Sequence, residues 1–154
     1  MPPPSVWGPF LWNVLHGIGA RCGKGIPALR RDEEREAMWI LIHIEYCIPC
    51  KECIDHIFQF KKKVPIPKSA DGIQEWICAL HNSVNEKLGK PIVEFSSDQE
   101  PETSESQSQE EGQDILTAWN TYLATIHDAI VLGQVSGPHL REFKRHLFLW
   151  MQCV

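Results

Sequence analysis

Apolar residues recur at helical spacing along most of this 154-residue chain, and that periodicity is the feature that most limits its possible folds. No segment carries a convincing strand pattern. The sequence therefore predicts an all-α protein. The expected helices are residues 5–21, 31–47, 50–63 and 71–90, followed by 114–133 and 139–154.

Proline and glycine residues mark the ends of these predicted helices. Pro9 falls in the first turn of the first helix, where a missing N–H group is tolerated. Pro49 ends the second helix and suits the first turn of the third. Gly89 and Pro91 close the fourth. We therefore expect four helices within residues 1–95.

A Ser-, Gln- and Glu-rich stretch over residues 96–113 is nearly free of apolar side chains, which predicts a mobile linker. Residues 98–114 carry seven acidic groups and no basic one. The remaining residues are near charge balance, so nothing indicates bulk nucleic-acid binding. The expected organisation is a bundle over 1–95, the linker, and a helical extension over 114–154.

The start of the chain, "MPPPSVWGPF", lacks the basic and apolar regions of a signal peptide. No stretch reaches the length of about 18–20 apolar residues that a membrane span needs. We therefore expect a cytoplasmic protein. Structural disulfides are rare in the cytosol, so the six cysteines call for a chemical explanation.

Three cysteines stand three residues apart, at Cys47, Cys50 and Cys53, and His56 follows at the same spacing. A zinc ion is one interpretation of this run. On one continuous helix, however, steps of three residues spread four ligands over about half the helix surface. Tetrahedral coordination would then be out of reach unless Pro49 breaks the helix.

A redox disulfide is the second interpretation, and the local pattern favours it. Cys50 and Cys53 at C-x-x-C spacing in a first turn can close a small ring. The helix N-terminus stabilises a thiolate, which lets the pair exchange with other thiols at neutral pH. Thioredoxin-like proteins use the same motif on a βαβ scaffold, which the helical pattern here contradicts. Another electron acceptor is then needed.

Two predicted helices carry unusual residues on one face. Gly8, Trp12 and His16 are four residues apart and line up in the first helix. In the fourth, core positions are filled by polar side chains, which need hydrogen-bond partners if they are buried. A bound polar aromatic cofactor would supply such partners, and a solvent-facing stripe is the alternative. That second stripe consists of Cys78, His81, Asn82, Asn85 and Gly89.

Three motifs resemble the Erv/ALR family of FAD-linked thiol oxidases. They are "WGPFLWNVLH" at residues 7–16, "IPCKEC" at 48–53 and "WICALHNSVNEKLGKP" at 76–91. Their order and spacing follow the family over roughly residues 5–95. The divergence and the acidic insert resemble a version carried by a large DNA virus.

The resemblance implies a four-helix bundle that cradles FAD, usually paired as a homodimer. It implies oxidation of protein thiol substrates to disulfides, with electrons passing through the Cys50–Cys53 disulfide to FAD and then to O2, giving H2O2. Cys53 would lie against the flavin, and Cys50 would be the outer sulfur that an incoming thiolate attacks. A cofactor-free disulfide carrier and a zinc-binding interaction module remain the alternatives.

The resemblance also implies a set of cofactor-binding residues on the first and fourth helices. Within it, the two lysines suit the diphosphate, and the aromatic rings suit adenine and flavin. The set is Gly8, Trp12, His16, Cys78, His81, Asn82, Val84, Asn85, Lys87 and Lys90.

The chain also departs from the family pattern. Ile48 replaces the active-site aromatic residue, and the usual disulfide partner of Cys78 is absent. A tryptophan near adenine has no counterpart, unless Trp119 substitutes. A Cys22–Cys153 disulfide is possible, and unpaired thiols at these two cysteines and at Cys47 are the alternative. Residues 114–152 have no obvious family counterpart.

Overall fold

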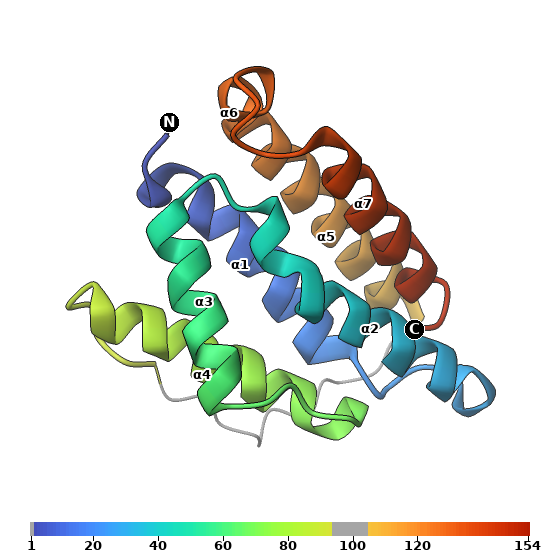
Figure 1. Ribbon diagram of the computed structural model, residues 1–154. Helices are drawn as coiled ribbons and strands as arrows, with labels where there is room; N and C mark the ends of the chain where they lie inside the picture. Colours follow the sequence, from blue (N-terminus) through green and yellow to red (C-terminus); the bar gives the residue numbers. More distant parts are fainter. Residues whose placement is uncertain (1, 94–104) are drawn as a thin grey trace.

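A computed structural model of the chain describes residues 2–93 and 105–154, excepting the side chains of 105–113, and these residues form helices without any strand (Figure 1). The all-α prediction is confirmed. Three short 3₁₀ helices are η1 (Pro27–Leu29), η2 (Ile44–Cys47) and η3 (Ala70–Gly72). The α-helices are α1 (Pro4–Arg21), α2 (Arg30–His43), α3 (Lys51–Lys63), α4 (Ile73–Lys87), α5 (Glu105–Thr125), α6 (His127–Val131) and α7 (Gly137–Met151).

Most helix boundaries lie within three residues of those expected, the helix expected over 114–133 is divided at Ile126 into α5 and α6, and two boundaries differ by more. The second helix was expected to run to residue 47, but α2 ends at His43 and the chain continues as η2. The fifth was expected from residue 114, but α5 begins at Glu105, so residues 105–113 of the predicted linker are helical. Residues 94–104 lie outside the described residues. The mobility of the linker and the division into three parts therefore stay predictions.

Helix α1 occupies the centre of the arrangement, with α4 on one side and α5 on another (Figure 1). Helix α7 packs along α2 and against η2, while α3 contacts α4 and η2. Two glycines let α1 approach its neighbours closely. A Cβ atom at Gly17 would lie 2.6 Å from the Ile115 side chain of α5, and one at Gly19 would lie 3.1 Å from the Gln74 Cα of α4.

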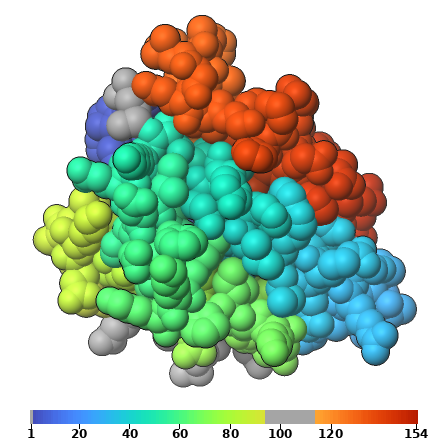
Figure 2. Space-filling model, in the orientation of Figure 1, coloured from blue at the N-terminus to red at the C-terminus, as the bar shows by residue number. Residues whose placement is uncertain are grey.

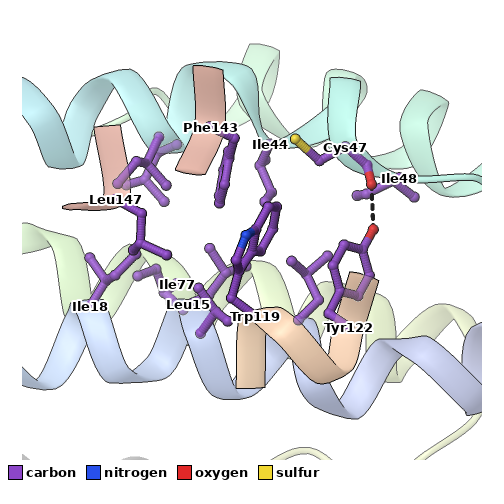
Figure 3. Close-up of a cluster of buried hydrophobic side chains, with 14 of the residues drawn as sticks. Leu15, Ile18, Ile44, Cys47, Ile48, Ile77, Trp119, Tyr122, Phe143 and Leu147 are labelled. Atoms are coloured by element: carbon purple, nitrogen blue, oxygen red, sulfur yellow. Dashed lines mark hydrogen bonds between the residues drawn. The ribbon is translucent and has the colours of Figure 1, made fainter. Parts of the chain in front are cut away.

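A single hydrophobic core joins the C-terminal helices to the rest of the molecule. Trp119, Tyr122, Phe143 and Trp150 are fully buried, and each contributes on the order of 1.5–3 kcal/mol through burial. Figure 3 shows side chains from α1, α4, η2, α5 and α7 pointing into this core. Removing residues 114–154 would therefore expose apolar side chains of α1 and η2.

The surface view shows how the C-terminal helices border the segment that precedes α3. In Figure 2 the orange and red residues lie along the cyan surface of α2 and η2, and α3, in green, forms the front of the molecule. Within the described part of the chain, none of the helices has both the length and the apolar character that crossing a bilayer requires.

Candidate functional site

The two cysteines of the C-x-x-C motif begin α3 and are joined by a disulfide, with their Cα atoms 5.2 Å apart. Cys50 is the N-cap residue, with extended backbone angles of φ −112° and ψ 111°. Its sulfur accepts a hydrogen bond from the Cys53 N–H at 3.3 Å. Pro49, which is buried, directly precedes it. The disulfide thus lies at the N-terminus of a helix, where free N–H groups favour negative charge.

The two sulfur-bearing residues differ in exposure. Cys50 is 8% exposed, whereas Cys53 is half-buried. Cys50 is expected to be the sulfur that the substrate thiolate attacks, but it is the less exposed of the two. Which sulfur is attacked first therefore stays a prediction.

The zinc interpretation requires Cys47, Cys50, Cys53 and His56 around one ion. The structure instead joins Cys50 to Cys53, and the His56 ring faces the Ser83 hydroxyl. Within residues 2–93 and 105–154, no group of three or more His, Cys, Asp or Glu side chains is placed to hold a metal ion.

His56 connects α3 to α4 one turn after Cys53. Its Nε2 atom is 2.8 Å from the Ser83 hydroxyl oxygen. Burial, and after it the charge of Lys87, lower the pKa of His56, so the ring is neutral at neutral pH. This contact couples the helix that carries the disulfide to the helix that carries the predicted polar stripe.

Three of the predicted cofactor-binding residues form a contact cluster between α1 and α4. The rings of Trp12 and His81 stack, with centroids 4.0 Å apart and planes at 8°. His16 Nε2 lies 2.7 Å from His81 Nδ1, so one ring donates a hydrogen bond to the other. Burial lowers the pKa of His16 to about 4, with a further contribution from His81. Burial, followed by the charge of Lys90, lowers that of His81.

Other predicted residues extend this cluster along the same helices. Gly8 lies two turns before His16 on α1, is buried, and a Cβ atom there would meet no atom of the described residues within 4 Å. Cys78 and Asn85 are buried on α4, and Val84 is half-buried. Burial raises the pKa of the Cys78 thiol to about 11, with a contribution from Glu75. The thiol is therefore protonated and unreactive at neutral pH.

The remaining three predicted residues lie in the second half of α4 or just after it. The Asn82 side chain binds the Val93 backbone in both directions, donating to its carbonyl at 2.9 Å and accepting from its N–H at 3.0 Å. The amide is therefore occupied with the chain that follows α4. Lys87 and Lys90 are exposed. The charge of Lys87 contributes to the lowered pKa of His56 on α3, and that of Lys90 to the lowered pKa of His81 on α4.

Trp119 belongs to α5, which packs against a different face of α1 from the face that carries Trp12 and His16. Its ring stacks on Phe143 at 4.7 Å in the core between α5 and α7. Because α5 packs on the face of α1 that carries Gly17, Trp119 is not beside Trp12 or His81. The structure therefore gives no support to Trp119 as the substitute for the family tryptophan.

The other cysteines are free thiols. Cys22, Cys47, Cys78 and Cys153 are all buried and unpaired, so the possible Cys22–Cys153 disulfide is not present. Burial raises the pKa of both Cys22 and Cys47 to about 12, with acidic neighbours adding to the effect. These thiols are poor nucleophiles at neutral pH.

Sequence reasoning missed two contacts near the disulfide. The His56–Ser83 bond was signalled only by the position of His56 one turn after Cys53, which we had considered as a metal ligand. The second is a hydrogen bond from the Tyr122 hydroxyl of α5 to the Cys47 carbonyl oxygen. Nothing in the helical pattern of residues 114–133 singles out Tyr122.

Comparison with known proteins gives a consistent result. The model of the Erv1 / Alr family matches residues 9–107. The FAD-linked sulfhydryl oxidase of African swine fever virus is 37% identical over 92 residues, which cover 58% of this chain and 74% of the viral protein. FAD-linked sulfhydryl oxidase ERV1 of rice is 35% identical over 82 residues, which cover 53% of this chain and 41% of the rice protein.

The mitochondrial FAD-linked sulfhydryl oxidase ERV1 of Saccharomyces cerevisiae is 30% identical over 93 residues, which cover 58% of this chain and 47% of the yeast protein. The chain thus spans less than half the length of the plant and yeast relatives. No solved structure gives a significant match. The family match ends at residue 107, before the described side chains of α5.

Proposed function

Because the chain belongs to the Erv1 / Alr family, we propose that it is an FAD-dependent sulfhydryl oxidase that forms disulfides in protein thiols. The observation that carries the proposal is the Cys50–Cys53 disulfide at the start of α3. Through His56 and Ser83 this helix adjoins the Trp12, His16 and His81 cluster. The proposal is supported because the disulfide and the residues predicted to bind the cofactor lie on helices that contact one another.

The residues of α1 and α4 fit FAD in chemical character. His16 and His81 are neutral at neutral pH, because burial lowers the pKa of both rings, so they place no positive charge beside an aromatic ligand. Lys87 and Lys90 are cations suited to a diphosphate. The open space beside Gly8 leaves room for a ligand to approach the α1 backbone. We propose that these residues, with Trp12, Cys78, Val84 and Asn85, hold the cofactor, and that Asn82 supports the site by binding the Val93 backbone after α4.

Bound FAD would supply an acceptor for two electrons and a route for them to O2, giving H2O2. The cysteines carry out the thiol chemistry. A substrate thiolate attacks one sulfur of the pair, which we take to be Cys50, and forms a mixed disulfide while Cys53 leaves as a thiolate. A second substrate thiolate then displaces Cys50, so the substrate leaves as a disulfide. Two electrons have then moved to the pair, and the two protons that the substrate thiols released on ionisation are taken up by the cysteine thiolates or by solvent.

Helix α3 lowers the energy of the thiolates that these steps require. Cys50 and Cys53 lie in its first turn, where backbone N–H groups have no helical acceptor. The Cys53 N–H already points at the Cys50 sulfur at 3.3 Å in the disulfide state. A thiolate at Cys50 would accept the same bond with greater strength, because a charged acceptor binds an N–H more tightly.

The proposal also covers the substrates, the final electron acceptor, the assembly and the location of the protein. We propose protein dithiols as substrates, O2 as the final acceptor, and a homodimer as the assembly. The cytoplasm of the host cell, or the virion, is the proposed location. Sedimentation of the purified full chain tests the dimer, because the monomer has a mass of 17.6 kDa.

Replacement of the cysteine pair tests the function. The variant with Cys50→Ala and Cys53→Ala should retain FAD and lose peroxide production with a dithiol substrate, because the electron path begins at the pair. Cys153→Ala is the matched control, since that thiol is buried at the other end of the chain, and it should keep wild-type turnover. Peroxide formation by the double variant would refute the assignment. A protein that binds no FAD would support the cofactor-free carrier instead.

A further inference from the structure

Tyr122 of the C-terminal extension reaches the backbone three residues before the redox disulfide. Its hydroxyl donates a hydrogen bond to the carbonyl oxygen of Cys47, and Figure 3 draws this bond as a dashed line. The two residues lie 75 positions apart in the sequence and are both fully buried. Tyr122 comes from α5, beyond the part of the chain that the family model matches.

The Cys47 carbonyl requires such a donor because of the local backbone. Helix η2 ends at Cys47, and the next residue, Ile48, is extended with φ −106° and ψ 130°. The extended Ile48 turns the chain away, so the N–H groups of Cys50 and Lys51, which would be the helical partners of this carbonyl, do not bond to it. A carbonyl at the end of a helix is without a helical partner, and leaving it unpaired in the interior is costly. The Tyr122 hydroxyl supplies the missing bond.

The setting of Tyr122 keeps its hydroxyl in the donor form. Its ring is edge-on to Trp7 of α1, with centroids 6.1 Å apart, and lies beside Trp119 at 5.6 Å. Burial, and then the neighbouring Cys47, raise the pKa of Tyr122 well above its usual range. The phenol therefore stays protonated at physiological pH and can donate to the carbonyl.

The chain between this carbonyl and the disulfide has little freedom. Ile48 and Cys50 are 3% and 8% exposed, and Pro49 between them is buried and has a fixed φ. Displacing the Cys47 carbonyl would therefore displace the N-cap residue of α3. We propose that Tyr122 is a positioning residue for the Cys50–Cys53 pair: by fixing the Cys47 carbonyl, it holds the turn in the geometry in which the disulfide closes and so favours the oxidised pair.

This inference rests on the proposed function only for its effect on turnover. The exchange equilibrium of the disulfide does not require a cofactor. Reduced dithiothreitol and the protein disulfide give the protein dithiol and cyclic oxidised dithiothreitol, with two electrons and two protons transferred. We would equilibrate the full chain anaerobically, block thiols by alkylation, and measure the oxidised fraction of the peptide that contains Cys50 and Cys53.

The variant Tyr122→Phe removes the hydroxyl and keeps the ring. It should shift this equilibrium toward the dithiol by up to about tenfold, the value reached when the bond is made in the oxidised state and lost on reduction. Trp150→Phe is the matched control, because Trp150 is equally buried but lies on α7 and makes neither of the ring contacts of Tyr122, which are to Trp7 and Trp119. It should lower stability and leave the equilibrium at the wild-type value. An unchanged equilibrium in Tyr122→Phe, or an equal shift in both variants, would overturn the proposal.

A second measurement avoids any loss of stability. The chain has two tyrosines, so labelling with 3-fluorotyrosine in a Tyr46→Phe background reports on Tyr122 alone. Tyr46 is exposed, and its replacement leaves the core intact. The fluorine resonance of Tyr122 should move when Cys50–Cys53 is reduced, because the turn then relaxes. An unmoved resonance would overturn the proposal. Absence of FAD would instead refute the proposed function and leave both measurements interpretable.

Discussion

Acidification should weaken the contact between α1 and α4 through His16. Burial lowers the pKa of this ring from 6.5 to about 4. A histidine whose pKa is depressed by folding binds its proton more tightly in the unfolded chain, so falling pH favours unfolding. The stability that neutral His16 contributes is therefore fully present above about pH 6.5 and is lost as pH falls from there toward about pH 4.

The size of the effect follows from the same shift. At about pH 4.5 the full shift corresponds to about 2.5 kcal/mol of lost stability. His16 is half-buried rather than fully buried, so solvent screening reduces this value. We expect a loss of about 1 kcal/mol between about pH 7 and pH 4.5 that is specific to His16.

Urea unfolding followed by circular dichroism, with cofactor-free protein at both pH values, measures this loss. His16→Gln does not titrate and can still hydrogen-bond to His81, so its stability should fall by about 1 kcal/mol less than that of the wild type. Carboxylates contribute equally to both proteins and cancel in the comparison. His127→Gln, at an exposed position with 72% side-chain accessibility, should behave as the wild type. Equal losses in the wild type and His16→Gln would refute the reasoning.

Three further predictions concern packing and the proposed cofactor site. Trp150→Ala should cost about 3–5 kcal/mol in thermal unfolding, because the ring is fully buried in the shared core; a loss near zero would contradict the docking of α7. Gly17→Val should cost about 1–3 kcal/mol, since even a Cβ would lie 2.6 Å from Ile115; an unchanged melting temperature would contradict the close approach of α1 and α5. Gly8→Ala should raise stability by up to about 1 kcal/mol and weaken FAD binding in a fluorescence titration; unchanged affinity would remove Gly8 from the site.

Helical periodicity and breaker residues predicted most of the helical framework. Pro49 correctly indicated that a new helix begins at the C-x-x-C motif, because proline can neither donate a helical bond nor follow a helical residue easily. The change from α2 to η2 after His43 was missed, since "IEYC" continues the apolar pattern without a breaker. The start of α5 at Glu105 was missed because acidic composition outweighed helix propensity in the prediction.

The candidate site was predictable to the extent that its residues share a helix. The spacing of Trp12 and His16 put them on one face of α1, and the family resemblance paired that face with His81. Contacts between distant segments left no such signal. The bond of Tyr122 to Cys47 depends on how α5 packs against α1, which a local pattern does not encode.

The visible absorption spectrum of the purified full chain tests the central claim most directly. We would record it before and after adding a dithiol, first without oxygen and then in air, while following peroxide. The account predicts a flavin band that bleaches on reduction through Cys50 and Cys53 and returns in air as peroxide appears. A colourless protein that also fails to take up added FAD would contradict the proposed oxidase activity.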